Sequence, residues 1–187
     1  MNYTNQHINQ LIEQCKSGKQ SAQLEIYNRY YKVMFNTAKR IVKDSYEAED
    51  IMQEAFLTAF TKLDSLKETS TFGSWLKRIV INNSIQQYHK NQKHDDVPLN
   101  DVLYKVEYTL ENEVITDNIT NLKAKQVLDT MNHLKENYRV ALTLHLIEGY
   151  DYEEISEILS ISYANCRTTI SRAKESLRKN LQLIAEY

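Results

Sequence analysis

Hydrophobic residues recur at steps of three and four along most of this chain, a spacing that is typical of helices with one buried face. The clearest such run follows Asp44 and continues over about four turns. Its hydrophobic positions are Ala48, Ile51, Met52, Ala55, Phe56, Ala59, Phe60 and Leu63. Asp44 and Glu47 have the spacing of a capping box, which places the start of this helix at Asp44.

Other runs of the same kind predict further helices. They cover residues 7–16, 21–42, 72–90, 122–133 and 136–148. Gly18 and Gly149 follow two of these segments and fit the role of helix stops. With 3 Gly and 1 Pro in 187 residues, the chain has too few turn-forming residues for a β-sandwich or a β-barrel. We therefore predict an all-α fold.

Charge divides the chain into blocks that the net charge of −2 conceals. Residues 1–94 hold 13 Lys/Arg and 9 Asp/Glu, whereas residues 95–120 hold 1 and 7. The single proline, Pro98, lies in this acidic stretch. We predict two small helical domains, residues 1–90 and 121–187, joined by an acidic linker over residues 91–120. Charge alone would also fit a plain solvated tether.

The segment "YEEISEILSISYANCRTTISRAKESLRKNL" predicts two helices joined by a short turn. Asp151 and Glu154 have capping-box spacing before the first helix, and Ser162 can cap the second. In the second helix Cys166, Ile170, Ala173 and Leu177 share one face, which should be buried. The residues left outside include Arg167, Thr168, Ser171, Arg172, Arg178 and Lys179.

This pattern fits a DNA-binding helix-turn-helix, whose second helix lies in the major groove. Residues 160–180 carry five basic side chains and one acidic, whereas residues 148–157 carry five acidic side chains and no basic one. The basic helix can therefore face phosphate while the acidic helix faces away. An ordinary helical hairpin with a charged, solvated face is the alternative.

Several other classes of protein find no support in the sequence. No apolar run approaches the roughly 20 residues that span a bilayer, and the first residues lack the apolar core of a signal peptide. We therefore expect no membrane insertion and a cytoplasmic location. Cys15 and Cys166 are expected to be reduced thiols. The five histidines form no metal motif, and neither a phosphate loop nor a nucleophile–base set is present. We expect no metal, no cofactor and no enzymatic activity.

Four segments together resemble the bacterial sigma factors of the extracytoplasmic-function (ECF) group. They are "DIMQEAF", "FGSWLKRIVINN", "LIEGYDYEEISEILSIS" and "ISRAKESLRKNL". The resemblance covers residues 20–90 and 122–181 in the order found in that family. It implies an initiation factor that binds core RNA polymerase, with residues 1–90 as region 2 at the −10 promoter element and residues 121–187 as region 4 at the −35 element. It also implies an anti-sigma partner, and an acidic linker that runs through the basic cleft of the polymerase.

The resemblance assigns three sets of site residues. Core polymerase would be bound by Asp50, Gln53 and Glu54. The −10 element would be bound by Lys67, Thr69, Lys77, Arg78, Asn82, Asn83, Gln86 and Lys90. The −35 element would be bound by Asn165, Arg167, Thr168, Ser171, Arg172 and Arg178.

The chain departs from the family pattern at two places. Gln86 and His89 stand where the family commonly has an aspartate and an arginine, and Asn165-Cys166 replaces a common Thr-Val. Asn165 is chemically able to read adenine, while Cys166 is expected to be a small core residue. Two alternatives remain: a stand-alone helix-turn-helix regulator that binds operator DNA as a dimer, and a helical interaction protein that binds no DNA.

Overall fold

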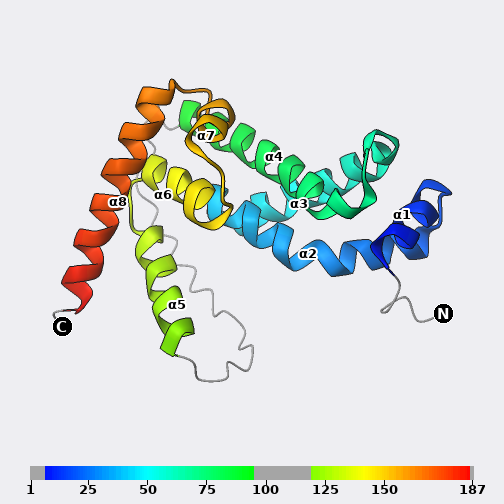
Figure 1. Ribbon diagram of the computed structural model, residues 1–187, viewed down its shortest axis with the longest axis horizontal. Coiled ribbons are helices and arrows are strands. Elements are labelled where there is room, and N and C mark those ends of the chain that lie inside the picture. Colours follow the sequence, from blue (N-terminus) through cyan, green and yellow to red (C-terminus); the bar gives the residue numbers. More distant parts are fainter. Residues whose placement is uncertain (1–6, 95–118, 186–187) are drawn as a thin grey trace. The chain divides into compact units, whose positions relative to one another are not determined.

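The computed structural model describes residues 7–94 and 119–185, and most of the predicted acidic linker lies outside these ranges. The described residues form helices and turns and contain no strand, which confirms the all-α prediction (Figure 1). The chain divides into two compact units, Met1–His94 (unit 1) and Asp95–Tyr187 (unit 2). None of the described helices is both long enough and apolar enough to cross a membrane.

Unit 1 is built from α1 (Ile8–Lys16), α2 (Gln20–Val42), α3 (Ser45–Thr61) and α4 (Phe72–His94). Helices α2, α3 and α4 each pack against the other two, and α1 packs against α2. The apolar faces predicted from the sequence meet between them. Fully buried side chains of this core include Leu11, Ile26, Met34, Ile41, Met52, Phe72, Leu76 and Ile81.

Helix α3 follows the prediction closely on its buried side. Six of the eight predicted positions are buried within the helix, and Leu63 is buried just after it. Phe60 is partly exposed, at the edge of an aromatic cluster in which its ring lies 6.0 Å from that of Phe56. Asp44 caps the helix, because its Oδ1 accepts a hydrogen bond from the Glu47 N–H at 2.9 Å.

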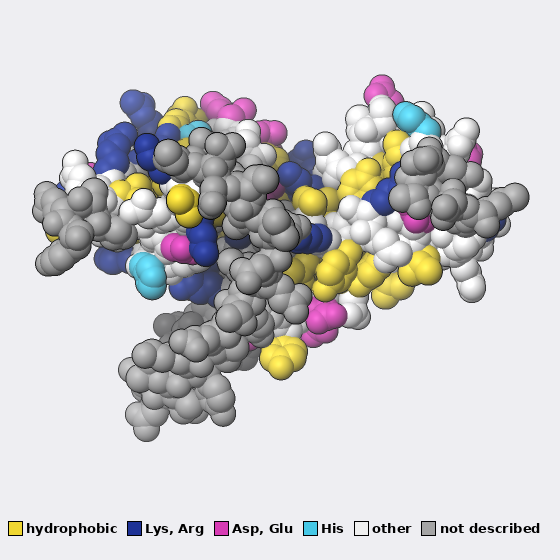
Figure 2. Space-filling model, turned by 90° about the horizontal axis from the view of Figure 1, so that it is seen from below, with side chains coloured by type: hydrophobic (Ala, Val, Ile, Leu, Met, Phe, Trp, Pro, Cys, Tyr) yellow, Lys and Arg dark blue, Asp and Glu magenta, His cyan; other side chains and the backbone are white. Residues whose placement is uncertain are grey.

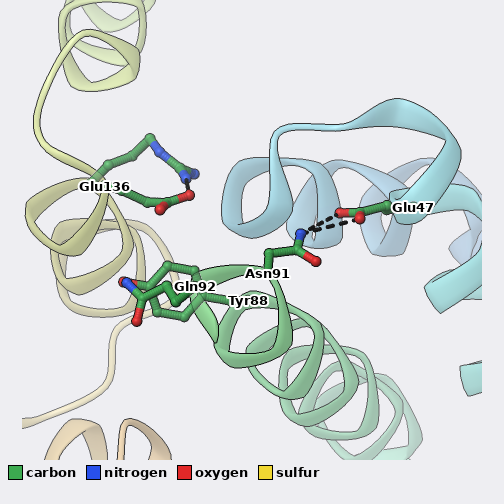
Figure 3. A network of polar contacts seen from close by, with 6 residues as sticks. Glu47, Tyr88, Asn91, Gln92 and Glu136 are labelled. Atoms are coloured by element: carbon green, nitrogen blue, oxygen red, sulfur yellow. Dashed lines mark hydrogen bonds and ion pairs between the residues drawn. The ribbon is translucent and has the colours of Figure 1, made fainter. Parts of the chain in front are cut away.

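The Glu47 side chain departs from the predicted capping box. Its carboxylate accepts a hydrogen bond from Gln87 Nε2 at 3.0 Å. It also accepts hydrogen bonds from Asn91 Nδ2 at 3.1 and 3.0 Å (Figure 3). Both donors belong to α4, so Glu47 joins the start of α3 to the last turns of α4. Gln92 Nε2 also donates to the Tyr88 hydroxyl at 2.6 Å. These contacts accompany a helix that extends to His94, beyond the predicted end at Lys90.

The segment between α3 and α4 is ordered. It forms two 3₁₀ turns, η2 (Leu63–Ser65) and η3 (Thr69–Thr71). Leu63 and Leu66 are buried, and α1 contacts both turns. Helix α1, which is distant in the sequence, therefore packs against this loop.

Unit 2 contains α5 (Ile119–Asn132), α6 (Glu136–Leu142), α7 (Tyr152–Ile158) and α8 (Tyr163–Ala185). Helix α8 packs against the other three. The helix predicted over residues 136–148 is α-helical only to Leu142 and then widens into a π-helical turn, Thr143–Ile147. The Glu148 N–H accordingly donates to the Thr143 carbonyl five residues back, at 3.0 Å. Gly149 follows with a φ of 82°, a conformation that glycine adopts without steric cost.

One charged residue lies in the core of unit 2. Arg139 is only 1% exposed, and its Nη2 donates to Glu136 Oε1 at 3.3 Å. The Glu136 side chain is 47% exposed, so this ion pair joins a buried cation to a carboxylate at the surface. The sequence pattern placed Arg139 within a helix but did not show that its side chain is buried.

Candidate nucleic-acid interface

Helices α7 and α8 form the predicted helix-turn-helix. The capping box before α7 is complete: the Glu154 N–H donates to Asp151 Oδ1 at 2.8 Å, and the Asp151 N–H donates to Glu154 Oε2 at 3.0 Å. Ser162 caps α8 by accepting a hydrogen bond from the Asn165 N–H at 3.2 Å. Between the two helices Ser160 adopts a φ of 53°, which turns the chain sharply.

The buried and exposed faces of α8 separate as the sequence predicted. Cys166, Ile170, Ala173 and Leu177 are buried against the rest of unit 2. The six residues assigned to the −35 element are all exposed on the helix: Asn165, Arg167, Thr168, Ser171, Arg172 and Arg178. In Figure 2 several Lys and Arg side chains lie where Figure 1 draws unit 2, which contains α8.

The first turns of α8 border a shallow hollow of about 500 Å³, lined by Tyr163, Ala164, Arg167, Thr168, Ser171 and Arg172. Tyr163 is 45% exposed and was not among the residues selected from the sequence. Its place directly after the capping Ser162 is the signal that could have indicated it. Arg167, Arg172 and Arg178 make no ion pair within the described residues of unit 2. Their guanidinium groups can therefore serve an external partner.

Hydrogen bonds fix two polar side chains on this surface. The Thr168 hydroxyl donates to the Ala164 carbonyl at 2.8 Å. The Thr169 hydroxyl donates to Asn165 Oδ1 at 3.3 Å, one turn back along the helix.

Farther along α8, the hydrogen bond from Lys179 lowers the pKa of the Glu175 carboxyl, and the positive charges of Lys179 and Arg178 add to this effect.

Helix α4 presents a second polar surface, on unit 1. Arg78, Asn82, Gln86 and Lys90 are all exposed and follow one another at intervals of four residues. Because the helix repeats every 3.6 residues, they form a gently winding stripe roughly 18 Å long. Lys77 and Asn83 lie beside the stripe and are partly buried. In the preceding loop Lys67 is exposed and Thr69 is half-buried in the η3 turn.

Helix α3 carries a third surface. Asp50, Gln53 and Glu54 are exposed, opposite the buried Ile51, Ala55 and Phe56. They are flanked by Tyr46, which is 78% exposed, and Leu57, which is 68% exposed. The sequence pattern had not indicated either residue. Positions 46, 50, 53 and 57 follow the helical repeat, so the polar residues and the two exposed apolar residues share one face. Tyrosine is enriched at protein–protein contacts, so Tyr46 makes this face a candidate contact surface.

The two cysteines are buried and reduced, and neither faces these surfaces. Burial raises the pKa of the Cys15 thiol to about 11, while burial and the nearby Glu153 carboxylate raise the pKa of Cys166. Only the thiolate is reactive, so both thiols should be inert at neutral pH. Within the described ranges no cluster of three or more His, Cys, Asp or Glu side chains could hold a metal ion.

We expect iodoacetamide to modify both cysteines slowly in the folded protein and rapidly in urea. The folded state holds the Cys15 proton more tightly than the unfolded chain, whose thiol has a pKa near 9.0. Cys15 therefore favours folding below about pH 9, and this contribution is lost as the pH rises toward 11. Mass spectrometry of labelled peptides over time measures both rates. Equal rates for Cys166 in buffer and in urea would show that its face of α8 is open.

Family models and curated relatives match most of this chain. The family model described as Sigma-70 region 2 matches residues 26–94, and the model described as Sigma-70, region 4 matches residues 124–177. The ECF RNA polymerase sigma factor SigW of Bacillus subtilis is 32% identical over 183 residues, which are 94% of this chain and 97% of SigW. The RNA polymerase sigma-H factor of Pseudomonas aeruginosa is 30% identical over 189 residues, with 96% of each chain covered.

Solved structures support the same fold. CnrH in complex with the cytosolic domain of CnrY matches with a TM-score of 0.53 at 21% identity, covering 94% of this chain and 97% of that chain. RpoE in complex with the anti-sigma factor NepR from Bartonella quintana also matches with a TM-score of 0.53 at 21% identity, covering 84% and 95%. The two sigma-region models match one unit each, and the two relatives align over 94% and 96% of this chain. The protein therefore belongs to the ECF family of RNA polymerase sigma factors.

Proposed function

We propose that this protein is a promoter-specificity subunit, which binds core RNA polymerase and directs it to a set of promoters. Unit 1 carries region 2 and would bind the −10 element, and unit 2 carries region 4 and would bind the −35 element. The observation that carries the proposal is that each unit matches its own sigma region and exposes a helix face rich in hydrogen-bond donors. Donors and positive charge are what a nucleic-acid surface requires.

The surfaces on α4, α8 and α3 would each bind a different partner. The stripe on α4, with Lys67 and Thr69 before it, would hold the −10 strand, because donors and cations suit single-stranded bases and their phosphates. The outer face of α8 would enter the major groove at the −35 element, with Arg167 near the helix start reading bases and Arg178 farther along contacting phosphate. The α3 face would contact the polymerase through Asp50, Gln53 and Glu54.

The remaining parts of the proposal concern partners and location. The acidic residues 95–120 would occupy a basic channel of the polymerase, since carboxylates there can replace phosphates. An anti-sigma factor is a further expected partner, because RpoE, which shares this fold, was solved with one. RNA synthesis would be performed by the polymerase, in the cytoplasm, and this chain would act as an initiation factor and not as an enzyme.

Run-off transcription tests the function directly. Purified core polymerase is given fragments of the source genome, with and without this protein. We expect discrete transcripts from a small set of fragments only when the protein is present, and their start sites should share sequence elements near −10 and −35. Core polymerase that gives the same transcripts with and without the protein would contradict the proposal.

A further inference from the structure

Tyr163 is the first residue of α8 and lines the shallow hollow of about 500 Å³ at the start of this helix. Its side chain is 45% exposed. The lining positions 163, 164, 167, 168, 171 and 172 follow the helical repeat, so they share one outward face. Side chains near the start of the second helix of a helix-turn-helix reach the edges of bases. Tyr163 therefore lies where a residue can take part in reading the sequence.

The Tyr163 ring is supported by other aromatic rings of unit 2. It lies against Tyr152 of α7, with ring centroids 6.4 Å apart and ring planes at 61°, in a T-shaped contact. The Tyr152 ring lies 5.1 Å from the imidazole of His145 in the π-helical turn. His145 also contacts α8, because its Nε2 lies 2.9 Å from Lys174 Nζ. A ring supported in this way loses less conformational entropy when it meets a partner.

The hollow differs in chemistry along its length. In the first turn of α8, Tyr163 and Ala164 supply an aromatic ring and a methyl group. Farther along, Arg167 and Arg172 supply hydrogen-bond donors, which suit the acceptors O6 and N7 of guanine. Among the groups that the bases present in the major groove, the C5-methyl of thymine is the apolar one. The apolar end of the hollow therefore complements thymine, as the arginine end complements guanine.

We propose that Tyr163 is a specificity-determining residue whose ring contacts the C5-methyl group of a thymine in the −35 element. The proposal rests on the proposed function and adds one residue and one base to it. The ring makes the contact and the hydroxyl does not, so phenylalanine should serve as well as tyrosine. A hydroxyl that bound a phosphate would instead strengthen binding to every sequence alike.

The test compares thymine with uracil, which lacks only this methyl group. In an active promoter each thymine of the −35 element, on either strand, is replaced in turn by deoxyuridine. Binding by the holoenzyme (this protein with core polymerase) is then measured by competition. For the wild type, one replacement should weaken binding about 4-fold, the size expected for the loss of one buried methyl group. Tyr163→Ala should bind the thymine and uracil forms of that promoter equally, and Tyr163→Phe should keep the difference.

Each variant is compared with itself on two DNAs, so a change in the amount of folded protein does not alter the ratio. A wild type that binds every uracil-substituted promoter as well as the parent would overturn the proposal. A loss that persists unchanged in Tyr163→Ala would also overturn it. So would equal weakening of Tyr163→Phe on both DNAs, because the hydroxyl would then be the contacting group. If the wild-type holoenzyme binds no promoter at all, the proposed function fails instead.

Discussion

Replacing Asp50 and Glu54 together by lysine should weaken binding to core RNA polymerase about 100-fold while leaving the fold intact. Both carboxylates are exposed on α3 and make no ion pair within the described residues of unit 1. Exposed substitutions of this kind change the free energy of unfolding by about 0.5 kcal/mol or less. A charge brought against a like charge at an interface costs several kcal/mol, and about 3 kcal/mol corresponds to roughly 100-fold in affinity.

The measurement is the anisotropy of the labelled protein titrated with core polymerase, together with thermal melting by circular dichroism. Glu13→Lys with Glu175→Lys is a matched control, because it changes the net charge by the same amount at two exposed glutamates away from the α3 face. Each of these glutamates pairs only with a neighbouring lysine on its own helix, Lys16 and Lys179, and exposed pairs of that kind contribute little. Equal losses in both variants would indicate a general charge effect, and an unfolded Asp50/Glu54 variant would make those residues structural.

Core polymerase should convert weak promoter binding by this protein into tight binding, with an affinity gain of at least about 100-fold. A protein binds DNA without help mainly through its own phosphate contacts, which favour a basic surface. This chain has a net charge of −2, and its residues 95–120 hold seven acidic side chains against one basic. Non-specific affinities lie at roughly 10⁻⁴ to 10⁻⁶ M, whereas specific complexes reach about 10⁻⁸ M or tighter.

A mobility-shift titration of labelled promoter duplex, with and without core polymerase, measures this gain. Binding by the free protein should fall steeply between low and moderate salt, and a duplex with scrambled −10 and −35 elements should bind the free protein equally well. With core polymerase, only the intact promoter should bind tightly. Tight and specific binding by the free protein, unchanged by core, would instead identify a stand-alone helix-turn-helix regulator.

The features that the sequence revealed are those that depend on neighbours along one helix. The buried face of α3, the capping box at Asp151 and the outward arginines of α8 all follow from steps of three and four residues. The hydrogen bonds of Glu47 could not be found in this way, because their donors lie 40 and 44 residues away. A capping box and a bond to another helix use the same carboxylate, and only the packing of α4 decides between them.

Other features were hidden for different physical reasons. The π-helical turn after Leu142 contains ordinary helix-forming residues, so nothing local distinguishes it from a continued α-helix. Tyr46 and Leu57 are large hydrophobic residues that a burial rule places in the core, yet they lie on the polar face of α3. Thr169 and Asn165 have helical spacing, but the hydrogen bond between their side chains is seen only in the structure.

The bond between Glu47 and the end of α4 has a thermodynamic consequence. Free helix ends fray, and a frayed backbone must be ordered at a cost of about 1–2 kcal/mol per residue when it binds a partner. Asn91 and Gln87 are held by a carboxylate on another helix, so the turns that carry Gln86 and Lys90 are already ordered. A ligand that contacts those two side chains therefore meets a preorganised backbone and keeps more of its interaction energy as affinity.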